Sequence, residues 1–475
     1  HLDVDNSFIY PACGLEGLIE VSRTCRMPLQ RASRASIGTI MSSLQLYQAI
    51  KDGVLIPWKK RNAESFKSAW ELLVADRGGF VFEPKVGLHD WVAEIDFSSM
   101  YPTLMATHNI SAETVLCKCC PDSKNRVPEL DYNICEKRIG IVPRVLNLIL
   151  EKRRQYKMLR DEAESPELRQ VYDRRQNALK WILVTCFGYL GYKNARFGKV
   201  DAHIAVCAIA RDILLRTMRI AEDHGFDVVH GIVDSLWLKK EGAPPKEYVE
   251  LCKAVYREVG VQLKVEGIYR WIVFLPSRMH GEVPVLNRYY GVFESGKIKV
   301  RGIEAVRGDT PPFIRRAQLS MVKVLAKASN SEEFKEKIPK SVEVLRDYVE
   351  KLKSSNVDIQ DLIIARRLSK NPGNYAHDVF QAVAARQLMK KGVEVSGGQT
   401  VRYLITDAGN KGSSKRVKAA ELVNAETRFD AEKYLDLLIL AGANILSPFG
   451  YTEKLLKDVV YGEKQSKLTP FPRTT

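Results

Sequence analysis

The sequence has 475 residues, of which 45% are hydrophobic and 27% are charged. This balance is typical of a folded globular protein and excludes a largely disordered or fibrous chain, and no apolar run approaches the roughly 20 residues that a membrane-spanning helix needs. Lys and Arg number 73 against 57 Asp and Glu, so the formal net charge is +16. This surplus favours a polyanionic partner, with nucleic acid ahead of a membrane surface.

The first part of the chain, to about Pro57, has a mixed pattern that favours neither helix nor strand. A glycine pair, Gly78-Gly79, then precedes a short extended stretch at residues 80–82. Residues 91–97 alternate between apolar and polar side chains, which predicts a half-buried strand that ends at the acid Asp96 and Phe97.

Two helices with basic side chains come next. Residues 142–161 place apolar side chains at three- and four-residue spacing, and Ser165-Pro166-Glu167 is typical of a turn and a new helix start. The second helix continues to Phe187 and ends at Gly188. We therefore expect an antiparallel helix pair.

The remaining elements follow from periodicity. Residues 200–224 predict one amphipathic helix, and residues 226–238 predict a β-hairpin with Asp234 near its turn. From Pro311 onwards the chain is predicted to be mostly helical and basic, interrupted by one strand-like stretch at residues 401–406.

Acidic and basic side chains in this order suggest a triphosphate site. Asp96 and Asp234 stand at strand ends, while Arg153 and Lys157 share one helix face and Lys180 lies on the next helix. Carboxylates bind Mg²⁺, and cations offset phosphate charge. Taken singly, a strand-end Asp is more often a cap or turn residue, and basic residues four apart are usually a solvated helix face.

Several segments resemble motifs of family-B DNA polymerases. Residues 96–103 (DFSSMYPT) resemble the first polymerase motif, D-F-x-S-L-Y-P-S, and residues 175–189 resemble the fingers motif, R-Q-x-A-x-K-x-x-x-N-S-x-Y-G. Residues 230–235 stand where the family has Y-G-D-T-D-S. Residues 288–289, 301–304 and 307–309 resemble the K-K-R-Y element and the palm-to-thumb passage. The order matches over nearly the whole chain and is most similar to the divergent archaeal group-two members.

The resemblance implies an α+β palm–fingers–thumb core with an antiparallel palm sheet, helical fingers and a mostly helical thumb. The expected division is an N-terminal stub with the first part of the palm at 1–140, fingers at 141–187, the second part of the palm at 188–304 and the thumb at 305–475. The implied reaction is template-directed addition of dNMP from dNTPs to the 3′ end of a DNA primer. We expect a cytoplasmic, nucleoid-associated enzyme without a membrane partner.

The resemblance also implies roles for individual residues. Asp96 and Asp234 would be catalytic and would bind two Mg²⁺ ions, which Mn²⁺ can replace, with the Phe97 carbonyl as a further ligand. The implied nucleotide-binding residues are Ser99, Met100, Tyr101, Arg153, Lys157 and Lys180. Tyr101 would lie under the incoming sugar and exclude ribonucleotides, although an aromatic before Pro102 can also be a core residue. The implied DNA-binding residues are Arg288, Tyr289 and Arg307.

The chain departs from the family pattern at the metal and base-pair positions. Ile232 stands where the family has its first Asp of the third motif, and Val184 replaces the fingers Asn. Phe187 replaces a Tyr. These changes predict slow or less faithful synthesis, as in repair or lesion bypass. They also leave open a second interpretation, a catalytically weak or silent polymerase-like DNA-binding subunit.

The residues before Asp96 are too few for the family's proofreading exonuclease domain. Only 95 residues precede it, and Asp3 and Asp5 are expected to be solvated. We therefore expect no proofreading by this chain.

A group of four cysteines follows the first motif, within a set of nine scattered cysteines that does not suggest a disulfide framework. The group, here called the cysteine cluster, consists of Cys117, Cys119, Cys120 and Cys135. Four thiols can bind Zn²⁺ tetrahedrally, but the C-x-C-C spacing is not a standard zinc pattern, so a packed cluster or a labile disulfide stays open.

Overall fold

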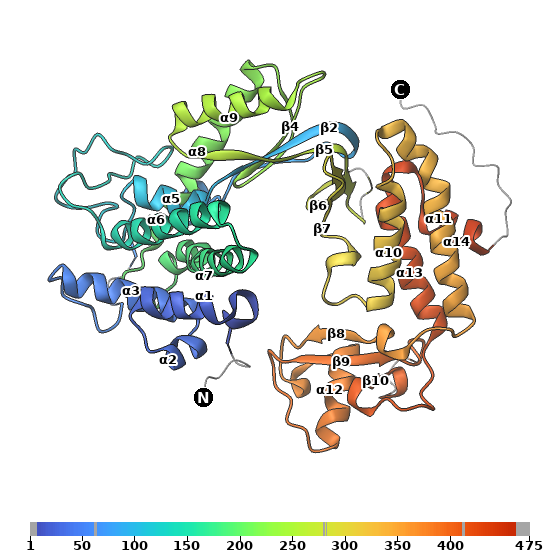
Figure 1. Cartoon of the computed structure of the whole chain (residues 1–475). Coiled ribbons are helices and arrows are strands. Elements are labelled where there is room, and N and C mark those ends of the chain that lie inside the picture. The colour runs from blue at the N-terminus through green and yellow to red at the C-terminus, as the bar shows by residue number, and fades with distance from the viewer. Residues whose placement is uncertain (1–6, 61–63, 279–280, 282, 411–413, 462–475) are drawn as a thin grey trace. The chain divides into compact units, whose positions relative to one another are not determined.

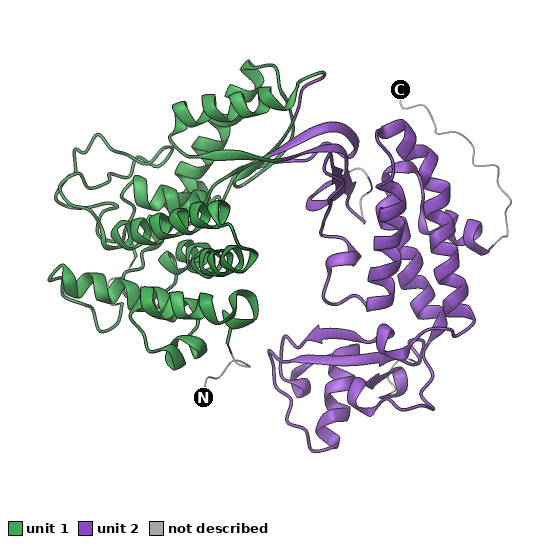
Figure 2. Ribbon diagram, viewed as in Figure 1, with its two compact units in different colours: residues 1–82, 95–238, 242–266 green, residues 83–94, 239–241, 267–475 purple. Residues whose placement is uncertain are grey.

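The computed structural model describes residues 7–60, 64–278, 281, 283–410 and 414–461, so Asp3 and Asp5 lie outside the described residues. The chain forms two compact units (Figure 2). Unit 1 comprises residues 1–82, 95–238 and 242–266, and unit 2 comprises residues 83–94, 239–241 and 267–475.

Helices make up most of unit 1 (Figure 1). They are α1 (Tyr10–Cys25), α2 (Leu29–Arg34), α3 (Ile37–Lys51), α4 (Ala69–Ala75), α5 (Met100–Thr107), α6 (Ile141–Glu162), α7 (Pro166–Leu190), α8 (Val200–Asp223) and α9 (Pro245–Val259). Helices α6 and α7 pack side by side, and α7 also packs on α1 and α3.

The antiparallel helix pair is confirmed. Ser165 caps α7 by accepting a hydrogen bond from the backbone N–H of Leu168, and Pro166 occupies the first turn, where its missing N–H is not needed. The buried residues of α6 are all in its first half, between Ile141 and Ile149. Its charged second half is therefore not buried in the apolar core.

The main sheet has seven strands in the order β1-β3-β4-β2-β5-β6-β7. They are β1 (Val81–Phe82), β2 (Gly87–Phe97), β3 (Asp227–Ile232), β4 (Ser235–Lys239), β5 (Leu263–Pro276), β6 (Pro284–Phe293) and β7 (Ile298–Arg301). The pairings of β1 with β3, of β5 with β6 and of β6 with β7 are antiparallel. The predicted strand and hairpin are therefore confirmed as β2 and β3–β4.

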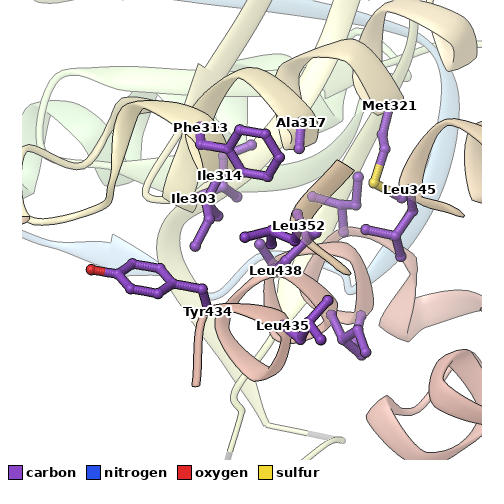
Figure 3. Packing of buried hydrophobic residues seen from close by; sticks show 14 of the residues in the cluster. Ile303, Phe313, Ile314, Ala317, Met321, Leu345, Leu352, Tyr434, Leu435 and Leu438 are labelled. Carbon is purple, nitrogen blue, oxygen red and sulfur yellow. The ribbon is translucent and has the colours of Figure 1, made fainter. Parts of the chain in front are cut away.

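Unit 2 is built on three helices, α10 (Pro312–Leu325), α11 (Ser331–Lys353) and α13 (Ala431–Leu446). Their buried side chains interlock, as Figure 3 shows for Phe313 and Met321 of α10, Leu345 of α11 and Leu438 of α13. Helix α14 (Glu453–Tyr461) packs on α11 and α13.

A second sheet in unit 2 differs from the sequence prediction of a single strand. This sheet consists of β8 (Ile364–Arg367), β9 (Thr400–Ile405) and β10 (Val417–Ala419), in the spatial order β10-β9-β8. Helix α12 (Phe380–Lys390) packs on β9 and β10. Only β9 is long enough to show a clear alternation. The mixed pattern before Pro57 likewise conceals α1, α2 and α3.

Six single-turn 3₁₀ helices complete the described part of the chain. They are η1 (Glu304–Val306), η2 (Ile359–Leu362), η3 (Pro372–Asn374), η4 (Ser414–Arg416), η5 (Ala420–Leu422) and η6 (Ser447–Phe449). Within the described residues no single helix has the length and hydropathy to cross a bilayer, and only the bent pair Ala431–Phe449 and Glu453–Tyr461 passes that test when its helices are taken together.

Candidate active site

Unit 1 brings the two predicted acids to adjoining strand ends. Asp96 is the last but one residue of β2, and Asp234 lies in the two-residue turn between β3 and β4. The backbone N–H of Phe97 donates a hydrogen bond to the carbonyl oxygen of Asp234 at 2.9 Å, and Ser235 Oγ donates to Asp96 Oδ1 at 2.8 Å. Ser235 thus links the two acids, a role that the motif alone did not assign.

The two carboxylates repel each other when both are ionised. Burial, together with the charge of Asp96, raises the pKa of Asp234 to about 6. Two carboxylates and the Phe97 carbonyl are hard oxygen donors, which Mg²⁺ and Mn²⁺ prefer. A divalent cation between the acids would remove their repulsion, so the donor set fits such an ion.

The turn that carries Asp234 is strained. Val233 has a φ of 55°, the left-handed region that a β-branched residue rarely adopts. Such a conformation costs about 1–2 kcal/mol. The pairing of Val81 with Ile232 and a hydrogen bond from the Val233 N–H to the Phe80 oxygen at 3.0 Å hold the turn in this state. Strain of this kind is found where the surrounding structure fixes a functional position.

The predicted phosphate-binding residues form a crowded group of positive charges. Burial, followed by the charges of Arg153, Lys264 and other cations including Lys180, lowers the pKa of Lys157 to about 8. Arg153 donates from Nη1 to Ser99 Oγ at 2.7 Å, while its buried Nε has no hydrogen-bond partner. An anion here would supply that partner and stabilise the charged form of Lys157.

The face of α6 that carries these cations is fixed by a buried acid on α1. Glu20 accepts hydrogen bonds from Lys152 Nζ at 2.8 Å and from the Tyr156 hydroxyl at 2.6 Å. Arg153 and Lys157 are the next residues along the helix and lie about 100° further round it. The Glu20 contacts therefore set the direction in which both cations extend.

Tyr101 belongs to an aromatic stack in unit 1. Its ring centroid lies 4.4 Å from that of Phe187, which stacks on His203 at 4.0 Å. A Cβ added at Gly79 would lie 3.0 Å from the Tyr101 hydroxyl oxygen and 3.1 Å from Val233 Cγ2. Gly79 therefore allows the Tyr101 ring and the strained turn to approach closely.

Besides Ser235 and Glu20, the sequence analysis missed three contributors to this site. His203 and Lys264 belong to no quoted motif and reach the site only through packing. The Gly78-Gly79 pair was identified as a turn signal, but nothing in the sequence showed what would approach it.

The other predicted residues lie as follows. The side chains of Phe97 and Met100 are buried, with 2% and 1% exposure, which leaves their backbone atoms for contact with a metal or nucleotide. Ile232 is half-buried at the end of β3, and Val184 is 62% exposed on α7. Lys180 is exposed on the same helix.

The predicted DNA-binding residues all belong to unit 2. Arg288 and Tyr289 are buried in β6, and burial, followed by the charges of Arg278 and Arg307, lowers the pKa of Arg288 to about 10. Arg307 forms a 2.9 Å ion pair with Asp309. Their contact with DNA stays a prediction.

The candidate site thus combines paired strand-end carboxylates with a cluster of cations in a mixed α+β fold, and comparison with known proteins specifies the family. The sequence profile of DNA polymerase family B matches residues 27–449. The chain therefore belongs to DNA polymerase family B, and the predicted fold class is confirmed.

Individual relatives agree. The chain is 29% identical over 462 residues to "DNA polymerase 2" of Aeropyrum pernix, covering 96% of this chain and 53% of the relative. It is 35% identical over 300 residues to "DNA polymerase 2" of Saccharolobus solfataricus, covering 63% and 43%. These names agree with the expected archaeal group-two resemblance. The chain thus spans about half the length of such relatives.

A solved structure supports the same fold. The family B DNA polymerase from the hyperthermophilic archaeon Pyrobaculum calidifontis matches with a TM-score of 0.64 and 31% identity, over 91% of this chain and 53% of that one. The four-part division by residue number stays a prediction.

The lowered pKa of Lys157 predicts a pH dependence of nucleotide binding. A lysine whose pKa is about 8 loses its charge as the pH rises through 8, so the Kd for dNTP should increase by up to about tenfold for each further pH unit. Lys157→Arg, which stays charged, should give a flat profile to about pH 10. Equal profiles for the two proteins, measured by equilibrium nucleotide binding, would contradict this assignment.

Proposed function

We propose that this chain is a template-directed DNA polymerase that adds dNMP from dNTPs to the 3′ end of a DNA primer. The observation that carries the proposal is that Asp96 and Asp234 lie at adjoining strand ends, in the same unit as Arg153, Lys157 and Lys180. Family membership and the net charge of +16 support DNA and dNTPs as substrates.

We assign the acidic residues to metal binding and the basic residues to triphosphate binding. Asp96, Asp234 and the Phe97 carbonyl would hold two divalent ions. We propose that both are Mg²⁺ and that Mn²⁺ can replace them. The chemistry that bound ions supply at such carboxylates is activation of the primer hydroxyl and neutralisation of the leaving pyrophosphate. Arg153 and Lys157 would bind and orient the triphosphate, which brings its α-phosphorus to the primer end.

Tyr101 is proposed to select deoxynucleotides. The Phe187 ring, 4.4 Å away between centroids, and the close backbone approach at Gly79 limit the movement of its ring. A ring held in this way can exclude a 2′-hydroxyl by steric contact, because it cannot turn aside. A DNA substrate also agrees with the predicted cytoplasmic, nucleoid-associated location, which stays a proposal.

Removal of either acid should abolish synthesis. Asp96→Ala and Asp234→Ala each lose metal-dependent stabilisation worth about 4 kcal/mol or more, which is a loss of about a thousandfold or more in single-turnover extension. Duplex binding should change little, since it depends on phosphate contacts. Asp227→Ala, an exposed acid on β3, is the matched control. Extension by both variants at the parental rate would exclude this site.

The second candidate, a silent DNA-binding subunit, is favoured by one observation. The side chain of Ile232, half-buried beside the turn, cannot bind an ion directly or through water. Asp234 remains at the position that the family motif assigns to the acid that bridges both ions. We therefore propose that the parent is active but slow and of low fidelity, as suits repair or lesion bypass.

Restoring the family acid separates these alternatives. A charged hydrogen bond to a metal-bound water is worth about 1.5–3 kcal/mol, so Ile232→Asp should accelerate single-turnover extension by up to about a hundredfold. Ile232→Asn, of matched size without the charge, should give much less. A parent that binds primer–template but yields no product with Mg²⁺ or Mn²⁺ would instead support the silent subunit.

We also propose that this chain alone does not proofread. Among the described residues, the cysteine cluster is the one group of three or more His, Cys, Asp or Glu side chains placed to hold a metal ion.

A mismatched primer end should accordingly stay intact. Incubation of the chain with a 3′-mismatched primer–template and Mg²⁺, without dNTPs, should release no dNMP. Release that is lost on treatment with a chelator and that copurifies with the chain through two columns would contradict the proposal.

A further inference from the structure

The connection between α5 and α6, residues 108–140, has no helix or strand although the structure describes all of it. Two isolated bridges, Val115 with Ile134 and Arg126 with Asn133, are its only β pairing. Loops longer than about 12–15 residues without secondary structure are uncommon in compact domains. This segment therefore requires some other restraint.

The cysteine cluster lies within the segment, and its four sulfur atoms converge. All four Sγ atoms lie within 4.8 Å of one another. Cys119 Sγ is 3.5 Å from Cys135 Sγ, and Cys120 Sγ is 3.8 Å from each of the other two. Tetrahedral thiolates at a Zn–S distance of about 2.3 Å are separated by about 3.8 Å, whereas a disulfide requires about 2.05 Å.

We propose that the cysteine cluster binds one Zn²⁺ ion through four thiolates. The separations match ligands around a single ion. An iron–sulfur cube attaches each thiolate to a different iron and would hold the sulfur atoms further apart. Three of the four cysteines are buried and Cys119 is exposed, which leaves one side of the site open to an entering ion.

Hydrogen bonds hold the ligands in place. The buried Asn133 donates from Nδ2 to the carbonyl oxygens of Cys117, at 2.9 Å, and Cys120, at 2.7 Å. Asn133 Nδ2 also donates to Cys117 Sγ at 3.6 Å. Outer contacts of this kind orient metal ligands.

A metal ion at this site would fix the position of the first turn of α6. Asn109 donates to the Cys135 carbonyl oxygen and accepts from the Gly140 N–H, each at 2.9 Å, and Glu113 accepts from the Ile141 N–H at 2.6 Å. These residues satisfy N–H groups at the first turn of α6. The same helix carries Arg153 and Lys157, so the metal would hold the phosphate-binding face in position.

Metal analysis of the untagged 475-residue chain tests the proposal. After purification with a reductant and supplied zinc, the parent should contain one zinc per chain. Reconstitution with Co²⁺ should give the thiolate charge-transfer and intense d–d absorption of tetrahedral sulfur coordination. Cys119→Ser, at the exposed member, should keep its circular dichroism spectrum but weaken metal affinity by more than the roughly 10–100-fold that loss of an outer partner causes.

Cys252→Ser, a buried cysteine on α9, is the matched control and should bind metal like the parent. Absence of stoichiometric metal in the reduced parent would overturn the proposal. Three other results would also overturn it. They are iron in place of zinc, a mass loss that reveals disulfides within the cluster, and a cobalt affinity of Cys119→Ser equal to that of the parent. Because none of these readouts requires primer extension, failure of the zinc site is distinguishable from failure of the proposed polymerase activity.

Discussion

Repulsion between two carboxylates at adjoining strand ends is the constraint on which the arrangement of unit 1 depends. Asp96 and Asp234 would separate if the chain allowed it, since burial and mutual charge raise the pKa of Asp234. Three features prevent this: the hydrogen bond from Phe97 to the Asp234 backbone, the Ser235 contact to Asp96, and the strained Val233 turn held by β1. The fold thus holds two carboxylates close together, which is the arrangement that the proposed divalent cations would need.

The positive charges of Arg153 and Lys157 are also held close together by the fold. Arg153 and Lys157 are crowded and partly desolvated, and the helix is held by contacts from Glu20 on α1. A triphosphate would relieve both the unpaired Arg153 Nε and the lowered pKa of Lys157. Preorganised groups of this kind need no rearrangement when charge develops during the reaction. Because the nucleotide would bind only the folded chain, its binding would also stabilise unit 1 against unfolding.

Local patterns predicted the elements that carry the candidate site residues, and tertiary contacts account for what was missed. Alternation gave β2 and the β3–β4 hairpin, and helical spacing with the Ser165 cap gave α6 and α7. The short strands β8 and β10 show no readable alternation, and the mixed N-terminal pattern concealed α1. The close approach at Gly79 and the charge of Lys264 near Lys157 depend on segments distant in sequence, so no motif reveals them. Convergence of the cysteine cluster was likewise an open alternative until its sulfur positions were known.

The central claim is that Asp96 and Asp234 jointly hold the ions that support nucleotidyl transfer. The most direct measurement is anomalous diffraction from Mn²⁺ in crystals of the chain bound to primer–template and a non-hydrolysable dNTP. The account predicts two manganese peaks between these carboxylates, with the triphosphate against Arg153 and Lys157, and loss of the peaks in Asp234→Ala. Manganese and nucleotide bound away from both carboxylates, in a complex that extends primers, would contradict it.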